Sequence, residues 1–240
     1  MKARGSNMNI AIILAGGTGS RMRSGKIPKQ YMIVHGRPVF TYALTTFQKN
    51  KNIDTIVIVA EEGWHDIIKE WIHKDKISKF RNFANPGKTR QHSIYSGLQA
   101  SEGFAEDNDI VIIHDVARPL VSEFIIEECL KGARQFGGAM PVLPMKDTVY
   151  LSEDGRAITG LLNRDELYAG QAPEAFVFGD YLKIHRNMTD DELGKTRGSS
   201  EIAYKNGIHI KLVEGSEINF KITTKEDLEK FESFIENGDH

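Results

Sequence analysis

The sequence predicts an α/β fold: a doubly wound, mostly parallel (Rossmann-like) β-sheet with helices on both faces and a projecting β-hairpin arm. Short β-branched apolar segments alternate with helical patterns along most of the 240 residues, and this alternation is typical of βαβ units. The apolar segments contain few polar residues, which indicates strands that are buried on both faces. Ligands of such sheets bind where the strands end at their carboxyl side.

The expected elements follow from these two patterns in chain order. The predicted buried strands cover residues 10–14, 55–60, 81–84, 110–113 and 139–143. The helical patterns between them cover residues 39–48, 63–73, 89–101 and 123–136. Two later strands are expected at 208–213 and 219–223, followed by a helix from residue 225 to about 236, with Thr224 as its N-cap and Asp227 completing a capping box.

The alternation breaks at residues 146–168, which predict the arm. Residues 147–151 and 157–162 have the pattern of two strands, and residues 153–155 form the turn between them. Arms of this kind often meet a second subunit, so we expect a homodimer; an ordinary surface hairpin is the alternative.

Composition limits the function classes. The 31 basic and 33 acidic residues nearly balance, so no overall field favours nucleic acid or an anionic membrane. The single cysteine, Cys129, allows no intrachain disulfide, and a cytoplasmic location is expected. The length suits one domain over residues 8–240, with residues 1–7 expected to be a vector-derived leader or an unfolded arm.

Residues 14–30, which read LAGGTGSRMRSGKIPKQ, predict a phosphate-binding loop after the first strand. Glycines let backbone N–H groups approach a polyanion, and the basic side chains add charge, so a nucleoside triphosphate is expected. A dinucleotide fingerprint would need a third glycine, and a P-loop would need a hydroxyl residue where Ile27 stands. A tight turn with solvated cations is the alternative. The glycines and cations concerned are Gly16, Gly17, Gly19, Arg21, Lys26 and Lys29.

Asp115, just beyond the strand at 110–113, is the predicted ligand of Mg²⁺. A carboxylate at the end of a buried parallel strand faces the ligand crevice, and Mg²⁺ prefers oxygen ligands. The alternative is that Asp115 caps the following turn or pairs with Arg118. His114 is expected to be structural.

One further segment and two single residues are candidates for ligand binding or catalysis because of their sequence pattern or their charge. The strand-to-helix junction with Gly87, Lys88, Arg90 and Ser93 is suited to bind a base or ribose, or is simply a helix start capped by Thr89. Arg164 stands beside the arm and is suited to bind a phosphate. Periodicity alone leaves the direction of Lys221 undecided.

Taken together, these segments resemble the cytidylyltransferase family that includes the methylerythritol-phosphate enzyme of isoprenoid synthesis and the ribitol-phosphate enzyme of teichoic acid synthesis. The resemblance covers residues 8–235 in order and spacing. The strings that carry it are LAGGTGSRM, PKQY, GRPVF, TRQHSIYSGL, HDVARPLV, KDTV, NRDELY and NFKITTKEDL.

The resemblance implies cytidylyl transfer from CTP to a polyol phosphate with release of pyrophosphate. It implies that the transition state is stabilised by Arg21, Lys29 and Lys221 and that Asp115 holds Mg²⁺. It implies a nucleotide pocket of Leu14, Ala15, Gly16, Gly17, Gly19, Gly87, Lys88, Ser93 and Asp115. The acceptor side is expected at Arg118, Arg164, Ala172 and Arg197.

Two departures fall on the expected acceptor side. Residues 171–174 read QAPE where the isoprenoid enzymes carry QTPQ, and residues 197–201 read RGSSE where they carry TDEAS. These changes favour ribitol or glycerol phosphate, for teichoic acid or capsule synthesis, over methylerythritol phosphate. A nucleotide-binding regulator without turnover and a sugar nucleotidyltransferase using UTP or dTTP are the remaining alternatives.

Overall fold

A computed structural model describes residues 7–17 and 27–238 of the chain. Its centre is an eight-stranded sheet in the order β10-β7-β11-β6-β1-β4-β5, with β12 pairing β7 outside this path. The strands are β1 (Asn9–Leu14), β4 (Thr55–Val59), β5 (Phe80–Ala84), β6 (Ile110–Asp115), β7 (Gly137–Pro144), β10 (Tyr168–Gly170), β11 (Glu174–Val177) and β12 (His209–Glu214).

The sheet is mostly parallel, as predicted. β1 runs parallel to β4 and β6, β4 to β5, and β12 to β7. β11 and β10 are antiparallel additions that the sequence did not predict. Both are only three or four residues long, which is too short for a hydrophobic period to stand out.

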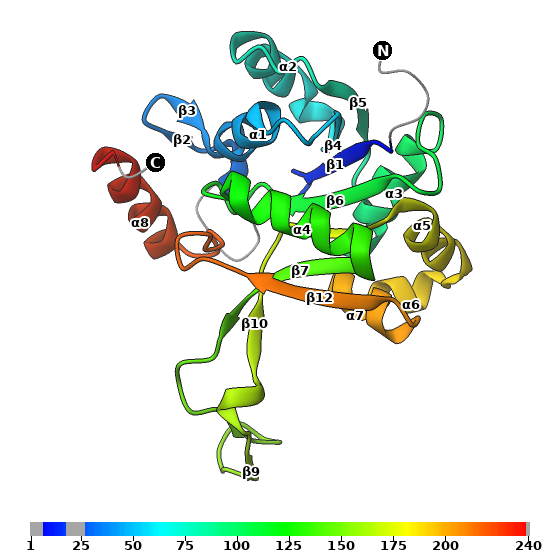
Figure 1. Cartoon of the computed structure of the whole chain (residues 1–240). Helices are drawn as coiled ribbons and strands as arrows, with labels where there is room; N and C mark the ends of the chain where they lie inside the picture. Colours follow the sequence, from blue (N-terminus) through cyan, green and yellow to red (C-terminus); the bar gives the residue numbers. More distant parts are fainter. Residues whose placement is uncertain (1–6, 18–26, 239–240) are drawn as a thin grey trace.

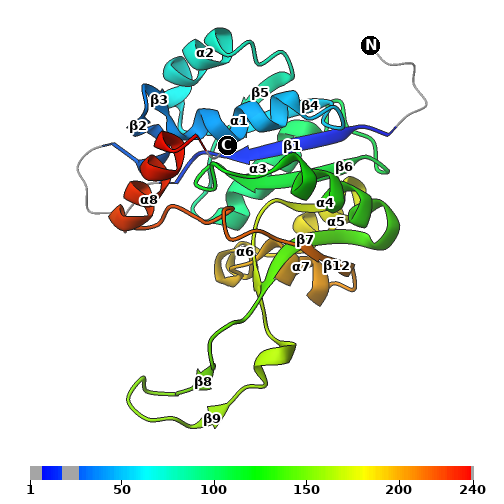
Figure 2. The same ribbon diagram turned by 60° about the vertical axis from the view of Figure 1, so that its left-hand side comes forward.

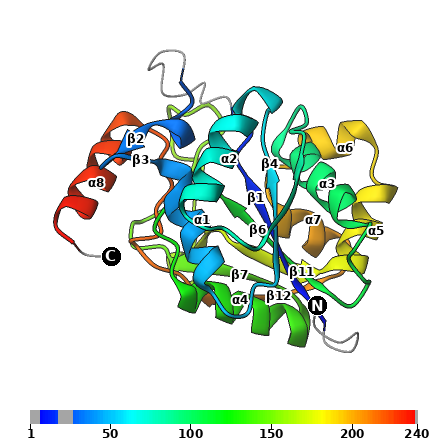
Figure 3. The ribbon, with the colours of Figure 1, turned by 90° about the horizontal axis from the view of Figure 1, so that it is seen from above.

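Helices cover both faces of the sheet (Figure 3). One face carries α1 (Val39–Lys49), α2 (His65–Lys74) and α4 (Glu123–Phe136). The other carries α3 (Arg90–Ser101), α5 (Phe178–Asn187), α6 (Asp190–Lys195) and α7 (Ser199–Lys205). Side chains of β1 alternate between the two cores, Ala11 and Ile13 on one face and Ile10 and Ile12 on the other, each at most 1% exposed. This double burial explains the unbroken apolar strands.

The predicted arm is present and projects away from the sheet (Figures 1 and 2). Its paired strands, β8 (Tyr150–Leu151) and β9 (Gly160–Leu161), are antiparallel but shorter than expected. The connection between them is longer than the predicted turn because Asp154 accepts backbone N–H groups from Arg156 and Ala157 and so closes a loop of its own.

The C-terminal part corrects one expectation. Residues 219–223 form no strand and join no ladder; Ile222 N–H donates to the carbonyl of Ala117 at 2.8 Å. The final helix is α8 (Lys225–Glu236), with the predicted capping box of Thr224 and Asp227. α8 packs on a small hairpin, β2 (Ile33–Val34) and β3 (Arg37–Pro38). Among the described residues, no helix combines the length and apolarity needed to cross a membrane.

Two buried histidines should make the fold sensitive to acid. Burial lowers the pKa of both His114 and His185 to about 4, so between pH 6.5 and 4 the unfolded chain binds more protons than the native one. The free energy of unfolding should therefore fall on acidification, by about 2 kcal/mol for each histidine from pH 7 to 5. Urea unfolding at pH 7 and pH 5 measures this change in the free energy of unfolding. His185→Phe should reduce the difference, whereas the exposed control His209→Gln should preserve it.

Candidate active site

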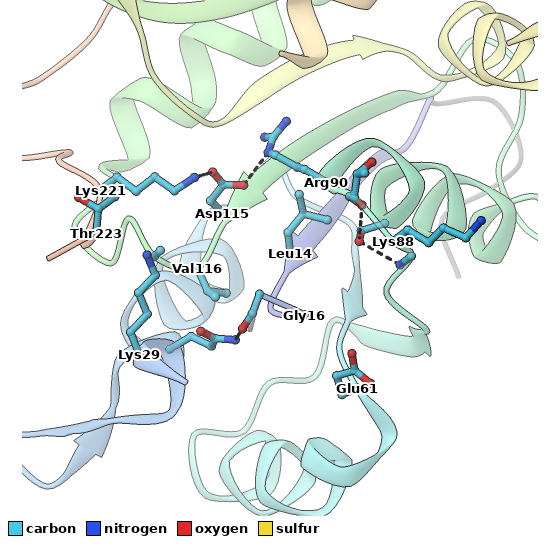
Figure 4. A pocket seen from close by; sticks show the side chains of 16 residues that line it. Leu14, Gly16, Lys29, Glu61, Lys88, Arg90, Asp115, Val116, Lys221 and Thr223 are labelled. Carbon is cyan, nitrogen blue, oxygen red and sulfur yellow. Dashed lines mark hydrogen bonds and ion pairs between the residues drawn. The ribbon is translucent and has the colours of Figure 1, made fainter. Parts of the chain in front are cut away.

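A cavity of about 360 Å³ opens at the carboxyl ends of β1 and β6 (Figure 4). It gathers residues from four parts of the chain: the loop after β1, the start of α3, the end of β6 and the segment before α8. The residues predicted from sequence that line it are Leu14, Gly16, Gly17, Lys29, Gly87, Lys88, Ser93, Asp115 and Lys221. The two sides of the predicted nucleotide pocket thus lie together.

The glycine loop is held in place by the short helix η1 (Lys29–Tyr31). Gln30 Nε2 donates to the carbonyls of Ala15 and Gly17 at 2.7 and 2.6 Å, and the Tyr31 hydroxyl also donates to the Ala15 carbonyl. Gly16 packs so closely that a Cβ there would lie 2.5 Å from the Pro86 Cβ. The PKQY string therefore fixes the loop and Lys29 relative to each other.

Two lysines reach the cavity from different elements. Lys29 Nζ donates to the carbonyl of Ile222, and Lys221 Nζ donates to Asp115 Oδ2 at 2.6 Å. Lys221 is thus directed toward Asp115 (Figure 4), which settles the direction that periodicity left open. Because residues 219–223 form no ladder, they can bring both Lys221 and the Ile222 carbonyl to the cavity.

Asp115 lies between two cations. Arg90 Nε donates to Oδ1 at 3.0 Å, opposite the contact of Lys221 with Oδ2. Burial alone would raise the pKa of Asp115, but the charges of Arg90 and Lys221 outweigh it and hold that pKa well below its usual range. The carboxylate is therefore ionised near pH 7. The alternative pairing with Arg118 is wrong, because that guanidinium donates instead to the carbonyl of Asn219 at 2.6 Å.

His114 is structural, as expected. It is fully buried, and its Nε2 lies 3.0 Å from the carbonyl of Arg118. Burial lowers its pKa to about 4, so the ring is neutral near pH 7 and orders the turn that follows β6.

The junction before α3 forms a second tight loop. The backbone N–H of Gly87 donates to Ser93 Oγ at 3.1 Å, and a Cβ on Gly87 would collide with His92. The expected cap is only partly right: Thr89 stands at the N-cap but makes no side-chain cap bond, and its hydroxyl lies 2.8 Å from His92 Nδ1.

Arg90 of the predicted junction also lines the cavity, whereas the other predicted residues that the structure describes do not. Gly19 and Arg21, with Lys26, lie outside the described residues. Arg118 and Ala172 lie behind it, where both support Asn219: Arg118 donates to its carbonyl, and the Ala172 carbonyl accepts from its side chain. Arg197 and Arg164 are exposed, the latter on η3 (Arg164–Glu166) beside the arm, where it donates to the carbonyl of Lys146. Ala15 is buried just beneath the glycine loop.

Sequence reasoning named Arg90 only as part of the junction suited to bind a base or ribose, and it gave Gln30 no role of its own, although both line the cavity. Arg90 stands at the first position of α3, where an arginine is usually a solvated surface residue. Only its contacts with buried carboxylates identify it, and no periodicity shows these.

Comparisons with known proteins identify the family. Residues 9–237 match the family described as IspD, 2-C-methyl-D-erythritol 4-phosphate cytidylyltransferase. The chain is 34% identical over 233 residues to a ribitol-5-phosphate cytidylyltransferase of Vibrio parahaemolyticus, which covers 97% of this chain and 98% of the relative. It is 38% identical over 235 residues to a 2-C-methyl-D-erythritol 4-phosphate cytidylyltransferase of Clostridium novyi, covering 95% and 97%. A crystal structure of the 4-diphosphocytidyl-2C-methyl-D-erythritol synthase of Anaerococcus prevotii superposes with a TM-score of 0.82 at 27% identity over 96% of both chains.

Proposed function

Because this chain belongs to the 2-C-methyl-D-erythritol 4-phosphate cytidylyltransferase (IspD) family and is a cytidylyltransferase, we propose that it transfers the cytidylyl group of CTP to ribitol 5-phosphate. The products are CDP-ribitol and pyrophosphate, for teichoic acid or capsule synthesis. The observation that carries the transfer is the pairing of a glycine loop with two lysines and Asp115 in one cavity.

The chemistry needs no protein nucleophile. A phosphate oxygen of the acceptor attacks the α-phosphorus of CTP, the new P–O bond forms, and the bond to the β-phosphate bridging oxygen breaks with its electron pair on pyrophosphate. The protein positions the two phosphates and stabilises the charge that develops on the phosphoryl oxygens. We assign this task to Lys29 and Lys221, which line the cavity, and to Arg21 by its motif.

Among the described residues of the cavity, Asp115 is the carboxylate that we propose as a ligand of Mg²⁺, and substrate would have to supply further ligands. Among the described residues there is no group of three or more His, Cys, Asp or Glu side chains able to hold a metal ion, and Asp115 already accepts bonds at both oxygens. Mg²⁺ commonly uses one or two carboxylates together with substrate phosphates and water. Asp115 would hold the ion with the phosphates of CTP, and the ion would neutralise charge on them.

The relatives include enzymes for two different acceptors, ribitol 5-phosphate and methylerythritol phosphate. The ribitol-5-phosphate relative matches almost the whole chain, and the QAPE and RGSSE strings depart from the isoprenoid pattern. The Clostridium relative supports methylerythritol phosphate as the alternative. Pyrophosphate release at fixed CTP should be faster with ribitol 5-phosphate than with glycerol phosphate or methylerythritol phosphate. Faster turnover of methylerythritol phosphate would overturn the assignment.

Substitutions in the glycine loop should separate packing from nucleotide binding. Gly17→Ala places its Cβ at the cavity with no atom of the described residues within 4 Å, so the melting temperature should not change while the KM for CTP rises about tenfold through crowding of the phosphates. Gly16→Ala forces its Cβ onto Pro86 and should lower the free energy of unfolding by about 1–3 kcal/mol. Calorimetry and initial rates measure both; an unchanged KM in Gly17→Ala would contradict the placement of CTP.

We also propose that the arm joins two chains as a homodimer. Large apolar side chains on the arm are about half or more exposed, namely Tyr150, Leu151, Ile158 and Leu161, and such patches mark interaction sites. Arg164 lies on the arm and not in the cavity of its own chain, so a partner's cavity is the place where it would meet an acceptor phosphate.

The wild type should sediment as a dimer, and the Ile158→Asp, Leu161→Asp double variant as a monomer, because desolvating a carboxylate in an apolar contact is costly. Ile33→Asp changes an equally exposed isoleucine outside the arm and should leave the dimer intact. A monomeric wild type at micromolar concentration would rule the arm out as the interface. The cytoplasm is the compartment that we propose, since the only cysteine, Cys129, is buried and unbridged.

A further inference from the structure

Four side chains of alternating charge run from the cavity into the protein: Lys221, Asp115, Arg90 and Glu174. The first three line the cavity, whereas Glu174 does not, and its side chain is only 8% exposed. Its Oε1 lies 3.3 Å from Arg90 Nη2. Among the described residues that line the cavity, Arg90 is the one with which Glu174 forms a hydrogen bond and ion pair, so Arg90 is the direct link from Glu174 to the cavity.

Glu174 is itself held firmly. Standing at the start of β11, it accepts the backbone N–H of Ser200 at 2.7 Å and the Ser200 hydroxyl at 2.8 Å, both at Oε2. On the same helix, α7, Ser199 Oγ accepts from Arg90 Nη1 at 2.5 Å. Arg90 therefore meets a different acceptor at each nitrogen: Asp115 at Nε, Ser199 at Nη1 and Glu174 at Nη2.

This division decides how Arg90 binds Asp115. A guanidinium prefers to grip a carboxylate with two parallel N–H donors, such as Nε and Nη2. In the structure Nη2 donates to Glu174 and makes no bond to Asp115, so Arg90 contacts Asp115 only through Nε at Oδ1, and Lys221 donates to Oδ2.

Resting on the function proposed above, we propose that Glu174 is a positioning residue: it confines Arg90 to one oxygen of Asp115 and so keeps the other oxygen for Lys221. Without Glu174, Nη2 is released to form a two-pronged contact with Asp115, and Lys221 loses the partner that fixes its ammonium group at the cavity. Glutamine cannot replace the carboxylate, since its amide has one acceptor oxygen and Glu174 accepts at both of its oxygens.

The same contacts connect the two departures from the isoprenoid pattern. Glu174 belongs to QAPE, and Ser199 and Ser200 belong to RGSSE. Ser200 donates to Glu174, and Arg90 donates to both Glu174 and Ser199, so the two altered strings are joined in one hydrogen-bonded unit beside the cavity.

Glu174→Gln is the test, with Ser200→Ala as the matched control. Glu174→Gln should lower kcat about tenfold, a size usual for residues that orient a functional group, with the KM for CTP changed less than threefold. Ser200→Ala removes one hydroxyl bond to Glu174 and leaves the Arg90 contact, so kcat should not change. In an Arg90→Lys background, Glu174→Gln should have no further effect on kcat, because Glu174 acts through Arg90.

A second readout does not depend on turnover. The Nε–H of Arg90, assigned by its loss in Arg90→Lys, should give a resolved, slowly exchanging NMR signal in the wild type and in Ser200→Ala, and a shifted or broadened one in Glu174→Gln. Equal kcat in Glu174→Gln and the wild type, or an unchanged Arg90 signal, would overturn the proposal. If the wild type releases no pyrophosphate from CTP, the proposed function fails, while the NMR comparison still tests Glu174.

Discussion

Lys221→Met should lower kcat for pyrophosphate release by about 10²–10³-fold, the effect typical of removing one preorganised donor from a developing anion. Lys221 Nζ is fixed 2.6 Å from Asp115 Oδ2 at the edge of the cavity, so its position is set before substrate binds. Methionine has nearly the same length but no charge. The KM for CTP should change little if the interaction is stronger in the transition state than in the ground state.

Steady-state kinetics with saturating acceptor measures this effect, and Lys211→Met is the control. Lys211 is exposed on β12, which pairs β7 and does not line the cavity, so the same substitution there should leave kcat unchanged. A Lys221→Met enzyme with wild-type kcat would exclude Lys221 from the reaction.

Asp115→Asn should cost both stability and activity. Removing one partner of a buried ion pair typically lowers the free energy of unfolding by about 3–5 kcal/mol, because the remaining charges lose their compensation. After the substitution Arg90 still forms its ion pair with Glu174. Lys221 loses its ion pair with Asp115, and the contacts shown at the cavity give it no second carboxylate. We therefore expect the lower end of that range, together with a fall in kcat of at least about 10²-fold.

The loss of unfolding free energy in Asp115→Asn should become smaller as the pH falls. Arg90 and Lys221 hold the pKa of Asp115 below its usual range, so its contribution is fully present above the unfolded pKa of about 4 and is lost as the pH falls below it. The difference in unfolding free energy between wild type and Asp115→Asn, measured in urea, should be constant from pH 7 to 5 and narrow toward pH 3. An equal stability at pH 7 would contradict the buried ion-pair network.

Sequence alone predicted the parallel part of the sheet and the grouping of the glycine loop with Asp115, because their signals are local. The strands β1, β4 and β6 are continuous apolar runs, and the residues that follow them in the chain must lie at the same edge of a parallel sheet. That rule alone brings Gly16 and Asp115 together, as the structure confirms.

The parts that sequence missed depend on contacts between distant segments. The roles of Arg90 and Glu174 come from bonds across 84 positions of the chain, and no periodic pattern encodes them. Residues 219–223 alternate like a strand, yet they pair with no strand: they lie between β12 and α8, and Ile222 bonds to Ala117 and Lys29 through single contacts. Side-chain direction there could only be seen in the fold.

Competition between acceptors tests the central claim most directly. The enzyme is given CTP, Mg²⁺ and equal concentrations of ribitol 5-phosphate, glycerol phosphate and methylerythritol phosphate, and the CDP-linked products are separated by mass at low conversion. Their ratio equals the ratio of kcat/KM values, the measure of specificity. CDP-ribitol should dominate, with one pyrophosphate released for each product molecule. A dominant CDP-methylerythritol would contradict the acceptor assignment, and pyrophosphate release without any CDP-polyol would contradict the transfer itself.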